Sequence, residues 1–202
     1  MTGKREAKRD ALRGGLIDAA TTRIAENGLS GLRARDITAD AGCALGALYT
    51  AFDDLDALII EVNSRTLRRI DAVMSAAVDG EINPGRQMKR LAAAYLDFAR
   101  AHPRLWRALF DHALPEGRAV PDWHIEDQAR LLVHIVGPLE KLQPALAREK
   151  LRVRARTLFA AVHGIVSISL ENRFVGIPID TLDDELDRFI DLLLSGLTTA
   201  SG

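Results

Sequence analysis

The stretch of sequence that decides the fold is residues 32–52, which read LRARDITADAGCALGALYTAF. The stretch predicts two helices of about two turns each, over 34–41 and 45–51, joined by a turn that contains Gly42. Two short helices can cross near right angles only where small residues line their contact, and Ala41 and Gly42 are placed for that. Such a pair cannot fold alone, so a further helix must cover its apolar side.

The apolar residues of this stretch predict which side is covered. Ile37, Cys43, Leu48 and Phe52 are expected to face Leu16, Ala20 and Ile24 of a preceding amphipathic helix, which leaves Ala44, Leu45, Ala47, Thr50 and Ala51 outside. An exposed short helix of small residues fits the major groove of duplex DNA, with Tyr49 at its flank and Arg35 at the start of the preceding helix near phosphates. The alternative is an ordinary helical hairpin whose alanines only make it compact.

The remaining sequence predicts an all-α protein, because no stretch alternates with period two for long enough to form a sheet. We expect helices over 8–27, 34–41, 45–51, 55–78, 86–101, from 103 to about 110, 122–142, 145–174 and 181–197, with Asp54 as the N-cap of the fourth. Pro138 is expected to kink the seventh helix or to mark its last turn. The predicted domains are 1–53 and 54–202.

Composition predicts a soluble globular protein of the cytoplasm. The 202 residues are 48% hydrophobic and 27% charged, and the lone Cys43 cannot form an internal disulfide. No apolar stretch reaches the roughly 18 residues of a membrane span, and the charged first 13 residues are unlike a signal peptide. Residues 1–52 contain eight basic and six acidic residues, and five of the basic ones lie in the first 13. Residues 1–13 are interpreted as a basic arm that contacts DNA; the alternative is a terminus that is merely solvated.

The order of these features resembles the TetR family of bacterial transcriptional regulators over residues 8 to 62. The matching features are the amphipathic first helix, Asn27-Gly28, Arg35-Asp36-Ile37, Ala41-Gly42, Gly46-Ala47-Leu48-Tyr49 and Phe52 before a long helix. The resemblance implies a three-helix DNA-binding domain, a fourth helix that connects it to a helical ligand domain, and two last helices that form a dimer. It also implies a homodimer on a palindromic operator.

The chain departs from the family pattern on the surface that would read DNA. Ala44 and Leu45 stand where the family usually has a serine and a polar or basic residue, and Leu55 stands where a lysine usually opens the fourth helix. Sequence specificity must then come from apolar contacts of Leu45 or Ala47 with thymine methyl groups, from Thr50, and from Arg33 and Arg35. We therefore predict binding that falls steeply with salt, because phosphate contacts carry more of the free energy. The candidate DNA-binding residues are Arg33, Arg35, Ala44, Leu45, Gly46, Ala47, Tyr49 and Thr50.

A small apolar effector is the second expected partner, because most of the aromatic residues lie beyond residue 81. The candidate ligand-binding residues are Trp106, Phe110, Trp123, His134, Phe159 and His163. The alternative is that these side chains only fill the core. His163-Gly164 resembles the Trp-His-Gly motif of one subset of the family, with Val162 in place of the tryptophan. A glycine at this point of a helix suggests close approach by another helix or by a bound molecule.

The expected dimer interface is formed by the helical segments Leu158–Ser169 and Leu182–Leu197, whose apolar faces are broader than one neighbour would bury. The alternative is that both lie inside the monomer core. We expect no enzyme activity, cofactor, metal or membrane partner, because no metal-ligand spacing, phosphate loop or nucleophile elbow is present. The sequence thus predicts a ligand-responsive repressor. The alternatives are a helical small-molecule-binding protein and a helical dimerisation module, neither of which would bind DNA.

Overall fold

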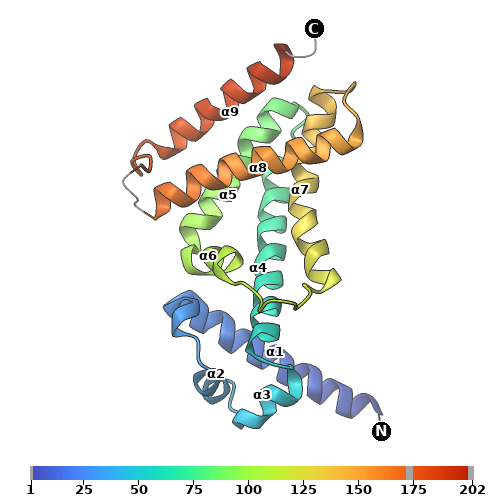
Figure 1. Cartoon of the computed structure of the whole chain (residues 1–202), viewed down its shortest axis with the longest axis vertical. Coiled ribbons are helices and arrows are strands. Elements are labelled where there is room, and N and C mark those ends of the chain that lie inside the picture. Colours follow the sequence, from blue (N-terminus) through green and yellow to red (C-terminus); the bar gives the residue numbers. More distant parts are fainter. Residues whose placement is uncertain (1, 172–174, 200–202) are drawn as a thin grey trace. The chain divides into compact units, whose positions relative to one another are not determined.

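The computed structural model describes residues 2–171 and 175–199, and in these ranges the chain is all-α, as predicted (Figure 1). Its α-helices are α1 (Thr2–Asn27), α2 (Ala34–Asp40), α3 (Leu45–Ala51), α4 (Leu55–Val78), α5 (Pro84–Ala101), α6 (Pro103–Asp111), α7 (Asp122–Leu142), α8 (Arg148–Leu170) and α9 (Leu182–Thr199), with a 3-10 turn at Leu29–Gly31.

Helices α1 and α8 differ most from the prediction, and the ends of the other helices agree with it to within two residues. Helix α1 begins at Thr2, six residues before the expected start at Lys8, because the basic and acidic residues of its first turns favour a helix without adding an apolar stripe. The predicted basic arm is therefore helical. Helix α8 begins at Arg148, three residues later than expected, and ends at Leu170; Phe174, its expected last residue, lies outside the described residues. Pro138 lies inside α7, one turn before its end.

The chain divides into two compact units. The N-terminal unit contains residues up to Arg68 together with His102–Ile125, and the C-terminal unit contains Arg69–Ala101 and the residues from Glu126 onward. Helix α6 and the loop after it thus belong with α1–α3, although they follow the predicted boundary after residue 53 by about fifty residues. Helix α4 contributes residues to both units.

The N-terminal unit is built around one apolar core. Leu16, Ala20 and Ile24 recur on one face of α1, and all three are fully buried. They form a cluster with buried residues of the next helices, namely Ile37, Leu48, Phe52, Leu58, Val62 and Leu105. Burial of one such aliphatic side chain contributes roughly 1.5–3 kcal/mol, which is how two helices of seven residues each stay folded.

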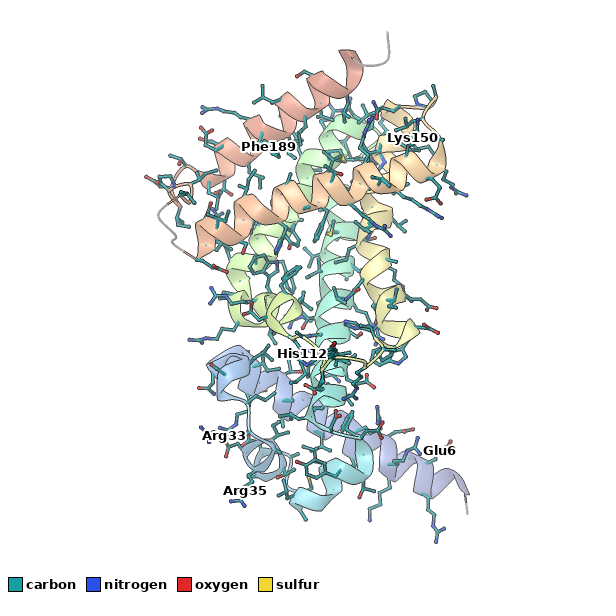
Figure 2. The ribbon with its side chains drawn as sticks, in the orientation of Figure 1. Glu6, Arg33, Arg35, His112, Lys150 and Phe189 are labelled. Carbon is teal, nitrogen blue, oxygen red and sulfur yellow. The ribbon has the colours of Figure 1, made fainter. Side chains whose placement is uncertain are left out.

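Polar contacts attach the α6–α7 segment to α4 within this unit. The Asn63 side chain donates to the Ala108 carbonyl at 3.2 Å, and Ser64 Oγ lies 2.6 Å from His124 Nδ1. His112 Nε2 lies 3.0 Å from a carboxylate oxygen of Asp56 (Figure 2). These contacts explain why a segment so far along the chain packs with the N-terminal helices.

The C-terminal unit packs α5, α8 and α9 against one another (Figure 1). Its core includes Leu91, Tyr95, Leu139, Leu158, Val162, Val166, Leu186 and Ile190. Two basic residues of α5 hold α9 at its surface: Arg100 forms a two-oxygen pair with Asp183 at 2.6 and 2.8 Å, and Lys89 contacts both Asp187 and Asp191. The hydrogen bonds from Arg100 lower the pKa of Asp183.

Helix α8 corrects one expectation. By length and mean hydropathy, 1.2 over an 18-residue window, α8 could cross a membrane, and only 28% of that window is buried inside the chain. The expectation that no stretch qualifies was wrong by this measure, because an average over a window tolerates a few charged residues. A core or interface helix of a soluble protein has the same composition, so the finding chiefly marks α8 as apolar and poorly covered.

Candidate DNA-binding interface

The turn between α2 and α3 has the hydrogen bonds of a Schellman motif. The Gly42 N–H donates to the Ala39 carbonyl at 3.1 Å, and the Cys43 N–H donates to the Thr38 carbonyl at 2.9 Å. This motif needs a left-handed residue after the helix, and Gly42 has φ +65°. The glycine that the sequence places here therefore stops α2 and turns the chain so that α3 can begin at Leu45.

The residues predicted to face inward from the α2–α3 pair are buried or half-buried. Ile37 and Leu48 are fully buried, Phe52 is nearly so, and Cys43 is half-buried. Because α3 has only seven residues, Leu48 is its one buried side chain, and Phe52 directly follows the helix. Two apolar anchors thus set how α3 rotates about its own axis.

The residues predicted to face outward from α3 are exposed or half-buried. Ala44, Leu45, Gly46, Tyr49 and Thr50 are exposed, Ala47 and Ala51 are half-buried, and Tyr49 leaves 55% of its area accessible. Arg33 precedes α2 and Arg35 lies in its first turn, and both side chains point away from the core (Figure 2). The Thr50 hydroxyl donates to the Gly46 carbonyl at 3.0 Å, so its proton is already used within α3. The roles of these residues in DNA binding remain predictions.

Arg13, counted in the sequence as part of the basic arm, is part of the internal structure instead. Its guanidinium donates to the Ala51 carbonyl at the end of α3 and to Glu61 at 2.6 Å, and it lies 4.3 Å from the centre of the Phe52 ring. One side chain thus satisfies a terminal carbonyl of α3 and covers its second apolar anchor. Sequence spacing gave no sign of this, because the partners are 38 and 48 residues away.

A second arginine of α1 is also paired. Arg23 donates to both carboxylate oxygens of Asp40 at 2.5 and 2.8 Å and so joins the last turn of α2 to α1. The hydrogen bond from Arg23 lowers the pKa of Asp40. Of the eight basic residues before Phe52, two therefore position α2 and α3 rather than face outward.

The start of α4 is acidic, where the family pattern leads one to expect a lysine. Asp54 is the predicted N-cap, and its carboxylate accepts the Ala57 N–H at 2.8 Å. This bond, and then the ion pair with Arg118 of the α6–α7 loop, lower the pKa of Asp54. Arg118 also lies 3.9 Å from Asp56, which His112 contacts from its other side. The loop thus places one positive charge beside these two acids at the start of α4, a role that the sequence did not reveal for Arg118.

The C-terminal unit contains a small apolar cavity of about 30 Å³. Its walls come from α4, α5, α7, α8 and α9, and they include Met74, Met88, Tyr95, Ile135, Phe159 and Ile190. The Tyr95 hydroxyl lies 2.9 Å from His163 Nδ1, and the His163 ring stacks on Phe159 at 5.9 Å between centres. Burial lowers the pKa of His163 below its ordinary 6.5, so this imidazole is neutral at pH 7.

The structure does not bring the six predicted ligand-binding residues together. Phe159 lines the cavity, and His163 is one contact behind it. His134 instead pairs with Asp71 at 2.7 Å. Trp106, Phe110 and Trp123 belong to the N-terminal unit, where Trp106 packs on Phe110 and Trp123 on His124. Aromatic content alone does not say to which unit an aromatic side chain belongs. The sequence analysis did not single out Tyr95, Met74 and Met88, which line the cavity. The roles of the six residues in ligand binding remain predictions.

Comparisons with known proteins agree with the geometry. A family model described as the Tetracyclin repressor-like C-terminal domain matches residues 88–193. A search of curated protein sequences found no match. Several solved structures share the fold. One is a protein with unknown function from Rhodococcus sp. RHA1, at 24% identity and a TM-score of 0.76, over 93% of this chain and 95% of that one.

Two further structures come from named regulators. A TetR-like transcriptional regulator from Rhodococcus sp. RHA1 is 20% identical, with a TM-score of 0.63, over 92% of this chain and 96% of that one. FadR from Bacillus subtilis, solved in complex with stearoyl-CoA, is 18% identical, with a TM-score of 0.68, over 90% of this chain and 97% of that one. At such identities these likenesses concern the fold.

Proposed function

Because the chain belongs to the TetR family of transcriptional regulators, we propose that it is a cytoplasmic homodimeric repressor that binds a palindromic operator through α3 and leaves it when a small apolar effector binds the C-terminal unit. The observation that carries this proposal is the exposed face of α3. An α-helix with its side chains is about 10–12 Å wide, close to the width of the major groove, and the small residues here let the backbone approach the bases.

The contacts with DNA divide into two kinds in this proposal. Leu45 and Ala47 give apolar contacts to thymine methyl groups, while Tyr49, Arg33 and Arg35 contact phosphates around them. Neither arginine has an ion pair within residues 2–171 and 175–199, so neither must break an internal contact to reach DNA. The surface has few base-reading donors, so counterion release supplies much of the affinity.

Dimerisation is supported by uncovered apolar faces on α8 and α9. Val153, Ile168 and Leu192 are exposed, the last leaving 72% of its area accessible, and Phe189 is half-buried (Figure 2). Among the described atoms, nothing lies within 4 Å of a Cβ added at Gly164, so the described residues do not supply the close neighbour that this glycine suggests. A second copy of the chain would cover these faces.

The effector is proposed to enlarge the apolar cavity. At about 30 Å³ the cavity has room for little more than a water molecule, whereas ligand sites measure roughly 300–1,000 Å³. Met74 and Met88 line it, and unbranched methionine side chains can repack around a guest. Met74 is in α4, the same helix whose Leu58 and Val62 pack in the core beside α3. A shift of α4 would thereby change the spacing between the two α3 helices of the proposed dimer.

The test is a mobility-shift assay with the full chain and DNA from upstream of its own gene. We expect a shift that the Arg35→Ala and Tyr49→Ala double variant abolishes, and that the Arg107→Ala variant on α6 retains. Light scattering should give a dimer for all three proteins, and Leu192→Arg should give a monomer. A dimer that shifts no DNA would favour a dimerisation module or a small-molecule-binding protein instead.

A further inference from the structure

A second ligand site is suggested by a groove between α7 and α8, within the C-terminal unit. Its volume is about 360 Å³, against about 30 Å³ for the apolar cavity, so it can hold a small molecule without any rearrangement. The cavity is lined by other residues. A ligand of the cavity would therefore not occupy the groove.

The two walls of the groove have opposite chemistry. The α7 wall is aliphatic and consists of Ala129, Leu132, Val133 and Val136, spaced as one face of a helix. Val133 leaves 67% of its area accessible, a large apolar exposure for a surface valine. The α8 wall consists of Arg148, Arg152 and Arg156, which recur every fourth residue. Three guanidinium groups thus follow one line of about 12 Å along the helix.

These arginines are available to a ligand. Arg148 and Arg156 have no acidic partner in the part of the chain that the structure describes, and Arg152 pairs only with the exposed Glu149 at 2.9 Å. Lys150, labelled in Figure 2, lies at the same end of α8, and residues 141–156 contain six basic residues and one acidic residue. The groove therefore attracts anions at one wall and hydrocarbon at the other.

We propose that this groove binds an anionic amphiphile, a phosphate or carboxylate head group attached to a hydrocarbon chain, as a single dissolved molecule. The head group accepts hydrogen bonds from the arginine row, and the chain lies along the valines of α7. A flat bilayer surface does not fit a concave groove.

A second copy of the chain is a poorer occupant. The one matching acidic row, Asp183, Asp187 and Asp191 on α9, is already paired with Arg100 and Lys89. Charge complementarity with another copy is therefore weak, and the free amphiphile is the better fit.

Calorimetric titration of the full chain with decyl phosphate, below its micelle concentration, tests the proposal. Decyl glucoside, with the same chain and a neutral head group, is the matched probe. We expect decyl phosphate to bind about tenfold more tightly, because three exposed charge contacts together give about one factor of ten. Equal affinity for the two probes, or no binding of decyl phosphate, would overturn the proposal.

Variants locate the site. The triple variant Arg148→Gln, Arg152→Gln and Arg156→Gln should lose the preference for phosphate, while Val133→Asn should weaken both probes about threefold by removing part of the apolar wall. The control triple Arg65→Gln, Arg104→Gln and Arg107→Gln removes the same charge from the N-terminal unit and should bind normally. If the arginine row changes only the sedimentation with phosphatidylglycerol vesicles and not the decyl phosphate affinity, the groove contacts membranes and the proposal fails.

Discussion

Replacement of Arg13 by glutamine separates a structural role from a phosphate contact. The sequence places Arg13 in a basic arm, whereas the structure has it bound to Ala51, Glu61 and the Phe52 ring. The substitution removes a charged hydrogen bond, a partly exposed ion pair and a cation–π contact. These contribute about 1, 0.5 and 0.5 kcal/mol, so the free energy of unfolding should fall by roughly 2 kcal/mol.

The fall in the free energy of unfolding can be measured as a lower melting temperature. For a chain of this size, 2 kcal/mol corresponds to a decrease of roughly 4–8 °C in thermal unfolding. DNA affinity should also fall, because α3 loses the contact at its last carbonyl. However, the slope of log affinity against log salt should stay that of the wild type, because no phosphate contact is lost.

Arg35→Gln is the matched control for this experiment. It removes one exposed charge without internal partners, so the melting temperature should change by no more than about 2 °C. Its salt slope should become shallower by about 0.9, the value for one phosphate contact. The reasoning is refuted if Arg13→Gln shows this second pattern, with a shallower slope and unchanged stability.

Three further outcomes follow from the described contacts. Leu48→Ala, at a fully buried position of α3, should lower the free energy of unfolding by about 2–5 kcal/mol in a denaturant titration, and a loss below 1 kcal/mol would contradict its role as anchor. Asp54→Ala should cost about 1 kcal/mol at pH 7 through the lost cap; because the folded pKa of Asp54 lies below 3.8, this difference from wild type should persist above that pH and shrink below it. Burial keeps the folded pKa of His163 below 6.5, so the unfolded chain takes up a proton first as the pH falls through 6.5 and the wild type loses stability there. His163→Asn should lack that part of the pH dependence when melting temperatures are compared between pH 7.5 and 5.5.

Local sequence was sufficient for most elements of the fold. Gly42 needs a left-handed conformation, and Asp54 supplies a carboxylate one residue before a helix, so both ends could be predicted from neighbouring residues alone. Leu48 in α3 and Phe52 directly after it likewise showed which side of α3 is buried, because they are four residues apart, about one helical turn. The opposite side of α3, with Tyr49, must then be exposed.

The residues that tertiary structure decided are those whose partners are distant in the sequence. Charge counting treated Arg13 and Arg23 like Arg33 and Arg35, yet the first two are held by Glu61 and Asp40. In the same way Arg118, in a loop with no motif, neutralises Asp54. A side chain's type limits the contacts it can make, but packing alone brings the partner within reach.

The proposed effector site shows the same division most clearly. Composition indicated that aromatic residues gather in the later part of the chain, but Trp106 and Trp123 belong to the N-terminal unit, while Tyr95 and His163 meet beside the cavity. What the sequence by itself determined is the helices, most of their ends and the buried faces of the N-terminal helices, because these depend on neighbours within a few turns. Which side chains share a cavity or a groove depends on how whole helices pack, and only the tertiary structure decided that.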